Sequence, residues 1–136
     1  MNALESRAHA VRIACRVALG LVWLYEGLVP KILFIRADQL ELVQRSGLYF
    51  GEPQTFLQLL GIAQAVFALW LLAGYAERHA VAIATAGMGI LIVLVAANNP
   101  DMLTDPYGAL IKDLCLIACA YAVWLLHPSD ARQQLH

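Results

Sequence analysis

Four runs of about 20 mainly apolar residues limit this chain to very few folds. They cover roughly residues 9–28, 55–75, 79–97 and 107–126. At 1.5 Å per residue, a helix of about 20 residues matches the ~30 Å hydrocarbon thickness of a bilayer. Within lipid, a helix satisfies all its backbone hydrogen bonds inside one such segment. The pattern predicts an all-α integral membrane protein, a single domain over residues 1–136 that folds as a four-helix bundle.

Composition supports lipid as the solvent of this chain. Apolar residues make up 61% of the 136 residues and charged residues only 14%, against about 25% charged in a typical soluble domain. A soluble domain of this size has too little interior to bury so much apolar surface. The net charge of −1 gives no basic footprint for nucleic acid, so that class of partner is excluded.

The connections between the runs differ greatly in length. Only AER, residues 76–78, separates the second run from the third, and such a short link predicts two adjacent antiparallel helices. The first connection is long, from Pro30 to Gln54, and contains ADQLELVQRSG. This stretch predicts a short helix that ends at Gly47. Its leucines indicate a helix that lies at the membrane interface or against the bundle.

An even number of spans places both termini on the same side of the membrane. Basic residues are enriched in cytoplasmic loops. Four arginines on the side of the termini, against three basic residues on the other side, favour cytoplasmic termini by one residue. The first set is Arg7, Arg12, Arg78 and Arg132, and the second is Lys31, Arg36 and Arg45.

Polar side chains are concentrated in one half of the predicted bundle. The chain direction brings the end of the first helix, the end of the third and the start of the fourth to the same side of the membrane. Ionisable groups at such depth cost roughly 2.5–3.5 kcal/mol each to insert, so they usually face the bundle interior. We therefore expect a polar pocket that binds a ligand or transfers protons. The candidates are Glu26, Lys31, Asn98, Asn99, Lys112 and Asp113, with Gln64 half-way along the second helix.

The end of the first helix, LVWLYEGLVPKIL over residues 21–33, has features that a plain membrane span does not need. Pro30 lacks an N–H and clashes with the previous turn, so it stops or kinks the helix. Gly27 permits the close approach of another backbone or of a ligand. Two structural explanations stay open. Glu26 and Lys31 can extend into the lipid headgroups, or Lys112 and Asp113 can form a buried ion pair that only fixes helix register.

Two arginines lie within the first predicted helix. Arg12 and Arg16 are four residues apart and share one face. Arg12 is near the helix end and within reach of Glu77 in the short link, whereas Arg16 lies deeper and the sequence names no definite partner for it. Because arginine does not readily release its proton, a static structural charge is the expected role of both.

Cysteine and histidine give little sign of an intrinsic cofactor. Cys115 and Cys119 share a face of the fourth helix, but a thiol in apolar surroundings is weakly reactive, which favours a packing role over redox chemistry. No histidine lies deep within a span. A metal or haem held between the helices is therefore not expected.

Two separate motifs resemble the DoxX-like family of small bacterial membrane proteins. WLYEGLVPKIL, residues 23–33, is similar to the first-helix signature of that family. LTDPYGALIKDLCLIA, residues 103–118, is similar to the start of its fourth helix, where an Asp-Pro-aromatic-Gly turn precedes a lysine and a polar residue. One position departs from the pattern. The family commonly has an acidic residue where this chain has Gln64, which keeps the hydrogen bonding and loses the charge.

The resemblance implies a place in the bacterial inner (cytoplasmic) membrane and a role as subunit or accessory of a quinone-linked oxidoreductase system. A quinone would enter the polar pocket between helices, and electrons would come from a partner protein. Proton transfer would fall to Glu26 or Asp113. The other candidates would bind the ligand, namely Lys31, Gln64, Asn98, Asn99 and Lys112.

Two other functions stay open. The same pocket suits a protein that binds or transports a small amphipathic molecule, with the broken end of the first helix as its gate. Inverted repeats would support this function, and the sequence shows none. Alternatively, a membrane anchor or assembly factor would use the polar residues for packing alone. A homodimer fits each of the three functions, because small residues on helix faces favour helix association.

Overall fold

The computed structural model describes residues 3–98, 100–103 and 109–127, and every regular element within these ranges is helical. This confirms the predicted all-α fold. The order of the helices along the chain is α1 (Ala3–Leu28), the π-helical turn η1 (Val29–Leu33), α2 (Ala37–Ser46), α3 (Pro53–Ala73), α4 (Glu77–Asn98), the short 3₁₀ helix η2 (Pro100–Leu103) and α5 (Ala109–Leu125).

Three helical segments are long and apolar enough to cross a membrane. They are Ala3–Leu33, Pro53–Ala73 and Glu77–Asn98. Helix α5 has 17 described residues and begins at Ala109, just after residues 104–108, which lie outside the described part of the chain. The four-span count therefore stays a prediction, while a helical membrane bundle is supported by the three segments.

The first helix is longer than its hydropathy predicts. It begins at Ala3 and does not stop at Pro30, because one π-helical turn carries the chain on to Leu33. In that wider turn the Phe34 N–H donates to the Val29 carbonyl at 2.8 Å, five residues earlier. A π turn lets a helix pass a residue that cannot donate, and such turns are frequent at functional sites.

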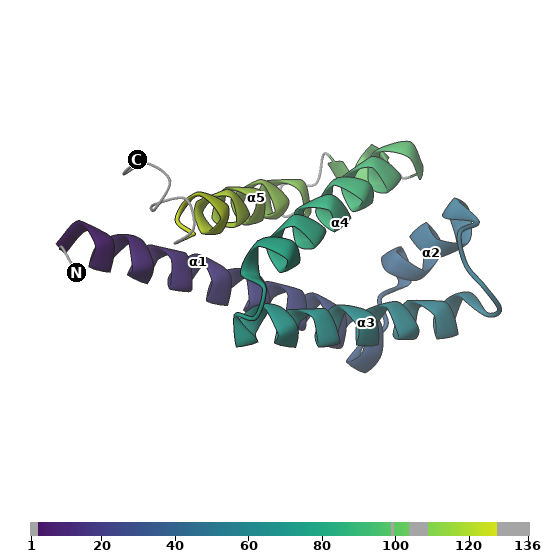
Figure 1. The fold of residues 1–136 in the computed structure, drawn as a ribbon. Coiled ribbons are helices and arrows are strands. Elements are labelled where there is room, and N and C mark those ends of the chain that lie inside the picture. The colour runs from purple at the N-terminus through teal and green to yellow at the C-terminus, as the bar shows by residue number, and fades with distance from the viewer. Residues whose placement is uncertain (1–2, 99, 104–108, 128–136) are drawn as a thin grey trace.

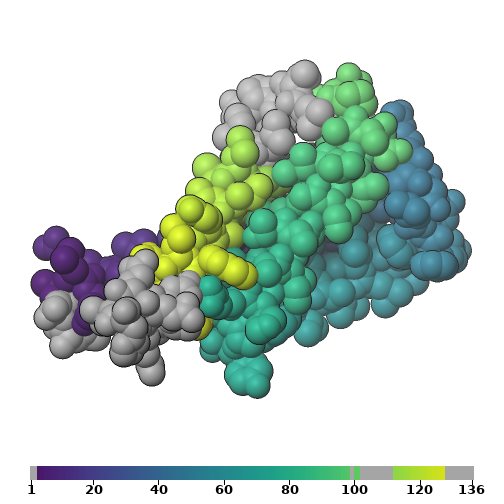
Figure 2. Space-filling view, turned by 45° about the horizontal axis from the view of Figure 1, so that its top comes forward, coloured from purple at the N-terminus to yellow at the C-terminus, as the bar shows by residue number. Residues whose placement is uncertain are grey.

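The bundle is built around three helix pairs. Helix α1 packs along α3, and α5 packs against both α1 and α4 (Figure 1). In Figure 2, α4 in green and α5 in yellow lie side by side across the visible face. Residues from four helices form the common core, and its buried members are Leu19, Leu71, Ala80, Val81, Met88, Leu116, Ala120 and Val123.

Two glycines set the distance between α1 and α3. A Cβ added at Gly61 would lie 2.6 Å from the Gly27 carbonyl oxygen, and one added at Gly27 would lie 2.8 Å from the Gly61 carbonyl oxygen. No side chain fits at either contact, so the two backbones touch here. The close approach that the sequence predicts at Gly27 is thus made by another backbone.

The long first connection contains the predicted short helix, α2. It ends at Gly47, whose positive φ of 64° closes the helix in the left-handed conformation that glycine favours. Helix α2 packs against both α3 and α4. Exposed Phe34 and Leu48 flank it, which suits a segment at the membrane interface.

Helices α3 and α4 diverge although only a short turn joins them. Positive φ angles at Gly74 and Ala76 reverse the chain, after which α4 runs away from α3 toward the far end of the bundle (Figure 1). Helix α4 then packs mainly against α5, and α2 contacts both α3 and α4. The sequence predicts that α3 and α4 are adjacent, but the two helices touch only over a short length. Helix α2, from the long first connection, packs against both of them.

Candidate functional site

The end of α1 is organised around the missing N–H of Pro30. In a regular helix this N–H would donate to the carbonyl of Glu26, four residues earlier. Instead, the Lys31 side-chain Nζ donates to the Glu26 carbonyl oxygen at 2.8 Å. Lys31 is only 8% exposed, so its ammonium group is held inside the protein. This substitution of one donor for another explains why a base follows the proline.

The carboxylate of Glu26 connects α1 to α5. Its Oε1 accepts a hydrogen bond from Lys112 Nζ at 2.6 Å. The Glu26 side chain is 26% exposed and that of Lys112 is 38% exposed. The pair is therefore half-buried, with part of both groups open to an approaching molecule.

Lys31 and Asp113 complete a group of four charges. The charges of Glu26 and Lys112 interact with the Lys31 ammonium group. The same two charges also interact with the Asp113 carboxyl group. We name Glu26, Lys31, Lys112 and Asp113 the α1–α5 charge cluster. It combines two ammonium donors with two carboxylates, so it can donate hydrogen bonds and exchange protons at one place in the bundle.

The three amide residues of the predicted pocket have different surroundings. The Gln64 side chain begins at the α1–α3 crossing, where its Cβ lies 3.2 Å from a Cβ built on Gly27. Asn98 donates from Nδ2 to the Leu94 carbonyl at 3.0 Å, so its amide is engaged within α4. Asn99 lies outside the described residues. The structure thus places Gln64 beside Gly27 at the α1–α3 crossing, and gives Asn98 a partner in its own helix.

A second charged group lies toward the start of α1 and of α4. Arg16 Nη1 donates to Glu77 Oε1, and Arg12 Nε lies 3.7 Å from Glu77 Oε2. Nη2 of Arg12 also lies 3.1 Å from Nδ1 of His9. Glu77 is only 6% exposed. We name Arg12, Arg16 and Glu77 the arginine cluster.

The direction of the chain indicates Glu77 as the partner of Arg16, although the sequence analysis names no definite partner. The short α3–α4 turn returns to the side of the membrane where α1 begins, so Glu77 faces both arginines. Gly74 makes room for the pair, since a side chain there would collide with the Arg16 guanidinium. A carboxylate between two arginines on one face of α1 fixes this turn against α1.

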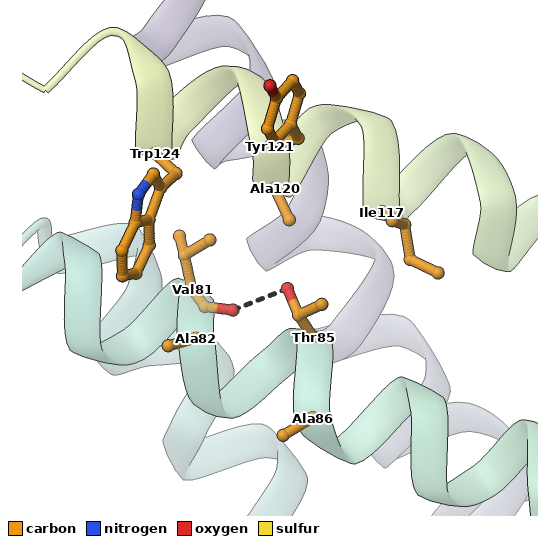
Figure 3. A pocket seen from close by; sticks show the side chains of 8 residues that line it. All are labelled: Val81, Ala82, Thr85, Ala86, Ile117, Ala120, Tyr121 and Trp124. Atoms are coloured by element: carbon orange, nitrogen blue, oxygen red, sulfur yellow. Dashed lines mark hydrogen bonds between the residues drawn. The ribbon is translucent and has the colours of Figure 1, made fainter.

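An open groove runs between α4 and α5, away from the predicted pocket residues. In Figure 3, Val81 and Thr85 of α4 point toward α5, while Ala120 and Trp124 of α5 point toward α4. The groove has a volume of about 530 Å³ and eight lining side chains. They are Val81, Ala82, Thr85, Ala86, Ile117, Ala120, Tyr121 and Trp124. Sequence reasoning missed this groove, although the small residues of α4 recur at helical spacing and offered a signal.

Comparison with known proteins places the chain in a family. The family model described as the DoxX-like family matches residues 20–121. This range covers most of the chain and holds α1 from Gly20, α2, α3, α4 and most of α5. The chain belongs to the DoxX-like family. The resemblance seen in the two sequence motifs is confirmed. All four residues of the α1–α5 charge cluster lie within the matched range. No curated protein and no solved structure matches this DoxX-like chain.

Proposed function

We propose that this DoxX-like membrane protein is a subunit or accessory of a quinone-linked oxidoreductase system, and that the α1–α5 charge cluster receives the quinone head group. The observation that carries the proposal is the half-buried Glu26–Lys112 pair, with N···O at 2.6 Å. Ionisable residues within membrane helices are expensive to insert and usually mark ligand or proton pathways. The proposal places the chain in the bacterial inner membrane with cytoplasmic termini.

The cluster divides the tasks among its members. Lys31 is tied to the Glu26 carbonyl, so it holds the end of α1 in place. Lys112 is the more exposed ammonium and would donate a hydrogen bond to a quinone carbonyl. Reduction of a quinone consumes protons as well as electrons, and Glu26 or Asp113 would accept protons and pass them on to the reduced head group. Electrons would come from a partner protein, because the sequence carries no recognisable motif for a redox cofactor.

A non-catalytic anchor is the second candidate, and one observation favours it. Glu26, Lys31 and Lys112 all have partners within the chain, as expected for a polar cluster that only holds helices together. The two functions differ in what the charges do. An anchor needs the Glu26–Lys112 bond for stability, whereas a quinone site needs it as a binding surface that exchanges one partner for another.

The test is to identify what the protein carries when it leaves its native membrane. The full chain would be purified in mild detergent, extracted with organic solvent, and the extract examined by mass spectrometry for a stoichiometric quinone. The variants Glu26→Gln and Lys112→Met are expected to lose the quinone while eluting as folded protein. Glu41→Gln on α2 removes an exposed ion pair and serves as the matched control that keeps it.

Either result is decisive. A quinone present in the wild type and in Glu41→Gln, and absent from the two cluster variants, supports the redox subunit. An extract of folded wild-type protein that holds only bulk lipid contradicts the proposal, and the anchor then becomes the better explanation of the cluster. A different stoichiometric amphipathic molecule would instead favour a binding or transport protein.

A further inference from the structure

Two cysteines from different helices contact each other within the bundle. A hydrogen bond joins the thiols of Cys15 on α1 and Cys119 on α5, and these two helices pack directly together (Figure 1). Both thiols are free and partly buried. Both also pack against the common core of the bundle. The contacts that hold α1 against α5 therefore also hold the two sulfur atoms together.

The third cysteine is placed differently. Cys115 is exposed and lies one turn before Cys119 on α5. Cβ atoms four residues apart on a helix are about 5–6 Å from each other, whereas a disulfide needs about 3.5–4.5 Å. The two cysteines of α5 therefore do not suit a disulfide, which agrees with the packing role that the sequence favours for them. The structure gives Cys119 another partner, Cys15, which lies on a separate helix and is not subject to this limit.

The surroundings favour a bond within the chain. Leu19 lies one turn after Cys15 on α1, and Leu116 and Ala120 flank Cys119 on α5. These three side chains are buried in the core, so they cover the inner side of the thiol pair. Both helices are apolar, and the partly exposed side of the pair is therefore open to oxidants that dissolve in a membrane.

Contact between the thiols offsets their low intrinsic reactivity. Apolar surroundings slow thiol chemistry because they disfavour the thiolate. An intramolecular step between well-oriented groups, however, has an effective molarity that reaches about 10⁵–10⁸ M. Once either sulfur of the pair is oxidised, the other one is the nearest nucleophile, and closure of the disulfide follows.

We propose that Cys15 and Cys119 form a reversible disulfide when a quinone dissolved in the membrane oxidises them. Two S–H bonds break and one S–S bond forms, while the two electrons and two protons released reduce the quinone to its hydroquinone. A dithiol reductant reopens the bond by thiol–disulfide exchange and is itself oxidised to a disulfide.

The thiol pair is separate from the α1–α5 charge cluster. Cys119 follows Lys112 by seven residues, about 10 Å along α5. A quinone head group held at the cluster would not touch the sulfur atoms, so the disulfide does not depend on the function proposed for the cluster. The oxidised state adds a covalent bond between the same two helices that the Glu26–Lys112 hydrogen bond joins.

The experiment counts the thiols of the full chain before and after oxidation. Protein in mild detergent would be reduced, freed of reductant, and treated with tetramethylbenzoquinone, which has no open ring position for thiol addition. Diamide serves as a second, general thiol oxidant. The protein would then be denatured in SDS, labelled with a maleimide and weighed by mass spectrometry. The variants are Cys15→Ala, Cys119→Ala and, as the matched control, Cys115→Ala, with circular dichroism and gel filtration to confirm folding.

The proposal expects one reactive thiol, Cys115, in the oxidised wild type and none in oxidised Cys115→Ala. Cys15→Ala and Cys119→Ala should each keep both remaining thiols, and dithiothreitol should restore the full count. A peptide map of the oxidised wild type, which needs no variant, should show Cys15 joined to Cys119. Folded Cys115→Ala that keeps both thiols with either oxidant overturns the proposal, as does a map that places Cys115 in the bond. A disulfide closed by diamide and not by the quinone overturns the assignment of the oxidant.

Discussion

The α1–α5 charge cluster and the arginine cluster use different residues at different depths of burial. The α1–α5 charge cluster contains lysines and carboxylates, and its Glu26–Lys112 pair is half-buried. The arginine cluster contains two guanidinium groups and one carboxylate, Glu77, which is 6% exposed. Lysine and carboxylate side chains change protonation state within reach of ordinary conditions, whereas arginine keeps its proton. One region is suited to exchange of partners and protons, and the other to a permanent structural bond.

Burial separates the Glu26–Lys112 pair from the ion pairs of Glu77. Removing one partner of a buried ion pair leaves an uncompensated charge and costs far more than removing one from an exposed pair. Three glutamates of the described residues form ion pairs at increasing exposure, namely Glu77, Glu26 and Glu41. Replacing each by glutamine makes the same chemical change three times, so the effects can be compared directly.

The largest effect is expected for Glu77→Gln. This change removes the carboxylate that faces both Arg12 and Arg16, and one buried and one partly buried guanidinium group then lack their counter-charge. We expect unfolding to become easier by about 3–5 kcal/mol. The measurement is the fraction folded during titration with SDS in detergent micelles, followed by tryptophan fluorescence. A loss below about 1 kcal/mol, the range of exposed pairs, would show that the arginine cluster is not a structural bond.

The next effect concerns the helix crossing that positions Glu26. Gly27→Ala places a methyl group against the Gly61 carbonyl, and overpacking of this kind costs about 1–3 kcal/mol. Gly89→Ala is the matched control, since a Cβ there meets nothing within 4 Å and alanine is the better helix former by about 0.5–1 kcal/mol. The same SDS titration should therefore shift in opposite directions for the two variants. Shifts of the same sign would contradict the backbone contact between α1 and α3.

A smaller effect on stability is expected for Glu26→Gln. Its partner Lys112 is partly exposed, so the lost pair should cost about 1 kcal/mol or less. If the α1–α5 charge cluster is a ligand site, this stable variant loses its bound quinone all the same. A loss of stability as large as that of Glu77→Gln would instead make the cluster a second structural bond and support the anchor. The comparison needs the SDS titration and the quinone content of the same preparation.

The sequence predicts the fold correctly where the bilayer permits only one kind of secondary structure. Apolar runs of span length must be helical in lipid, and topology alone gathers Glu26 and Lys112 in one half of the bundle. It did not predict the extension of α1 to Ala3, because the polar first residues of that helix carry no hydropathy signal. The sequence predicts that Pro30 stops or kinks the first helix, but not that a π-helical turn carries the chain on to Leu33, where the Lys31 side chain donates to the Glu26 carbonyl.

The pairing of particular side chains could not be predicted from the sequence for a different reason. Whether Glu26 meets Lys112 depends on the rotation of α1 and α5 about their own axes. That rotation is fixed by core packing of residues such as Leu19 and Leu116, which no local pattern specifies. The partner of Arg16 was missed in the same way, although the direction of the chain placed Glu77 on the correct side of the membrane.

The smallest effect is expected for Glu41→Gln, and it calibrates the others. Glu41 pairs with Arg45 one turn along α2 at 2.6 Å, with side chains 51% and 54% exposed. The N···O distance equals that of the Glu26–Lys112 pair, although one pair lies within a single helix and the other joins two helices. Water screens the exposed pair, and an (i, i+4) bond of this kind contributes about 0.3–0.5 kcal/mol. The SDS midpoint should hardly move. If Glu41→Gln shifted the midpoint as much as Glu26→Gln, the difference in burial between α1–α5 and α2 would have no energetic consequence.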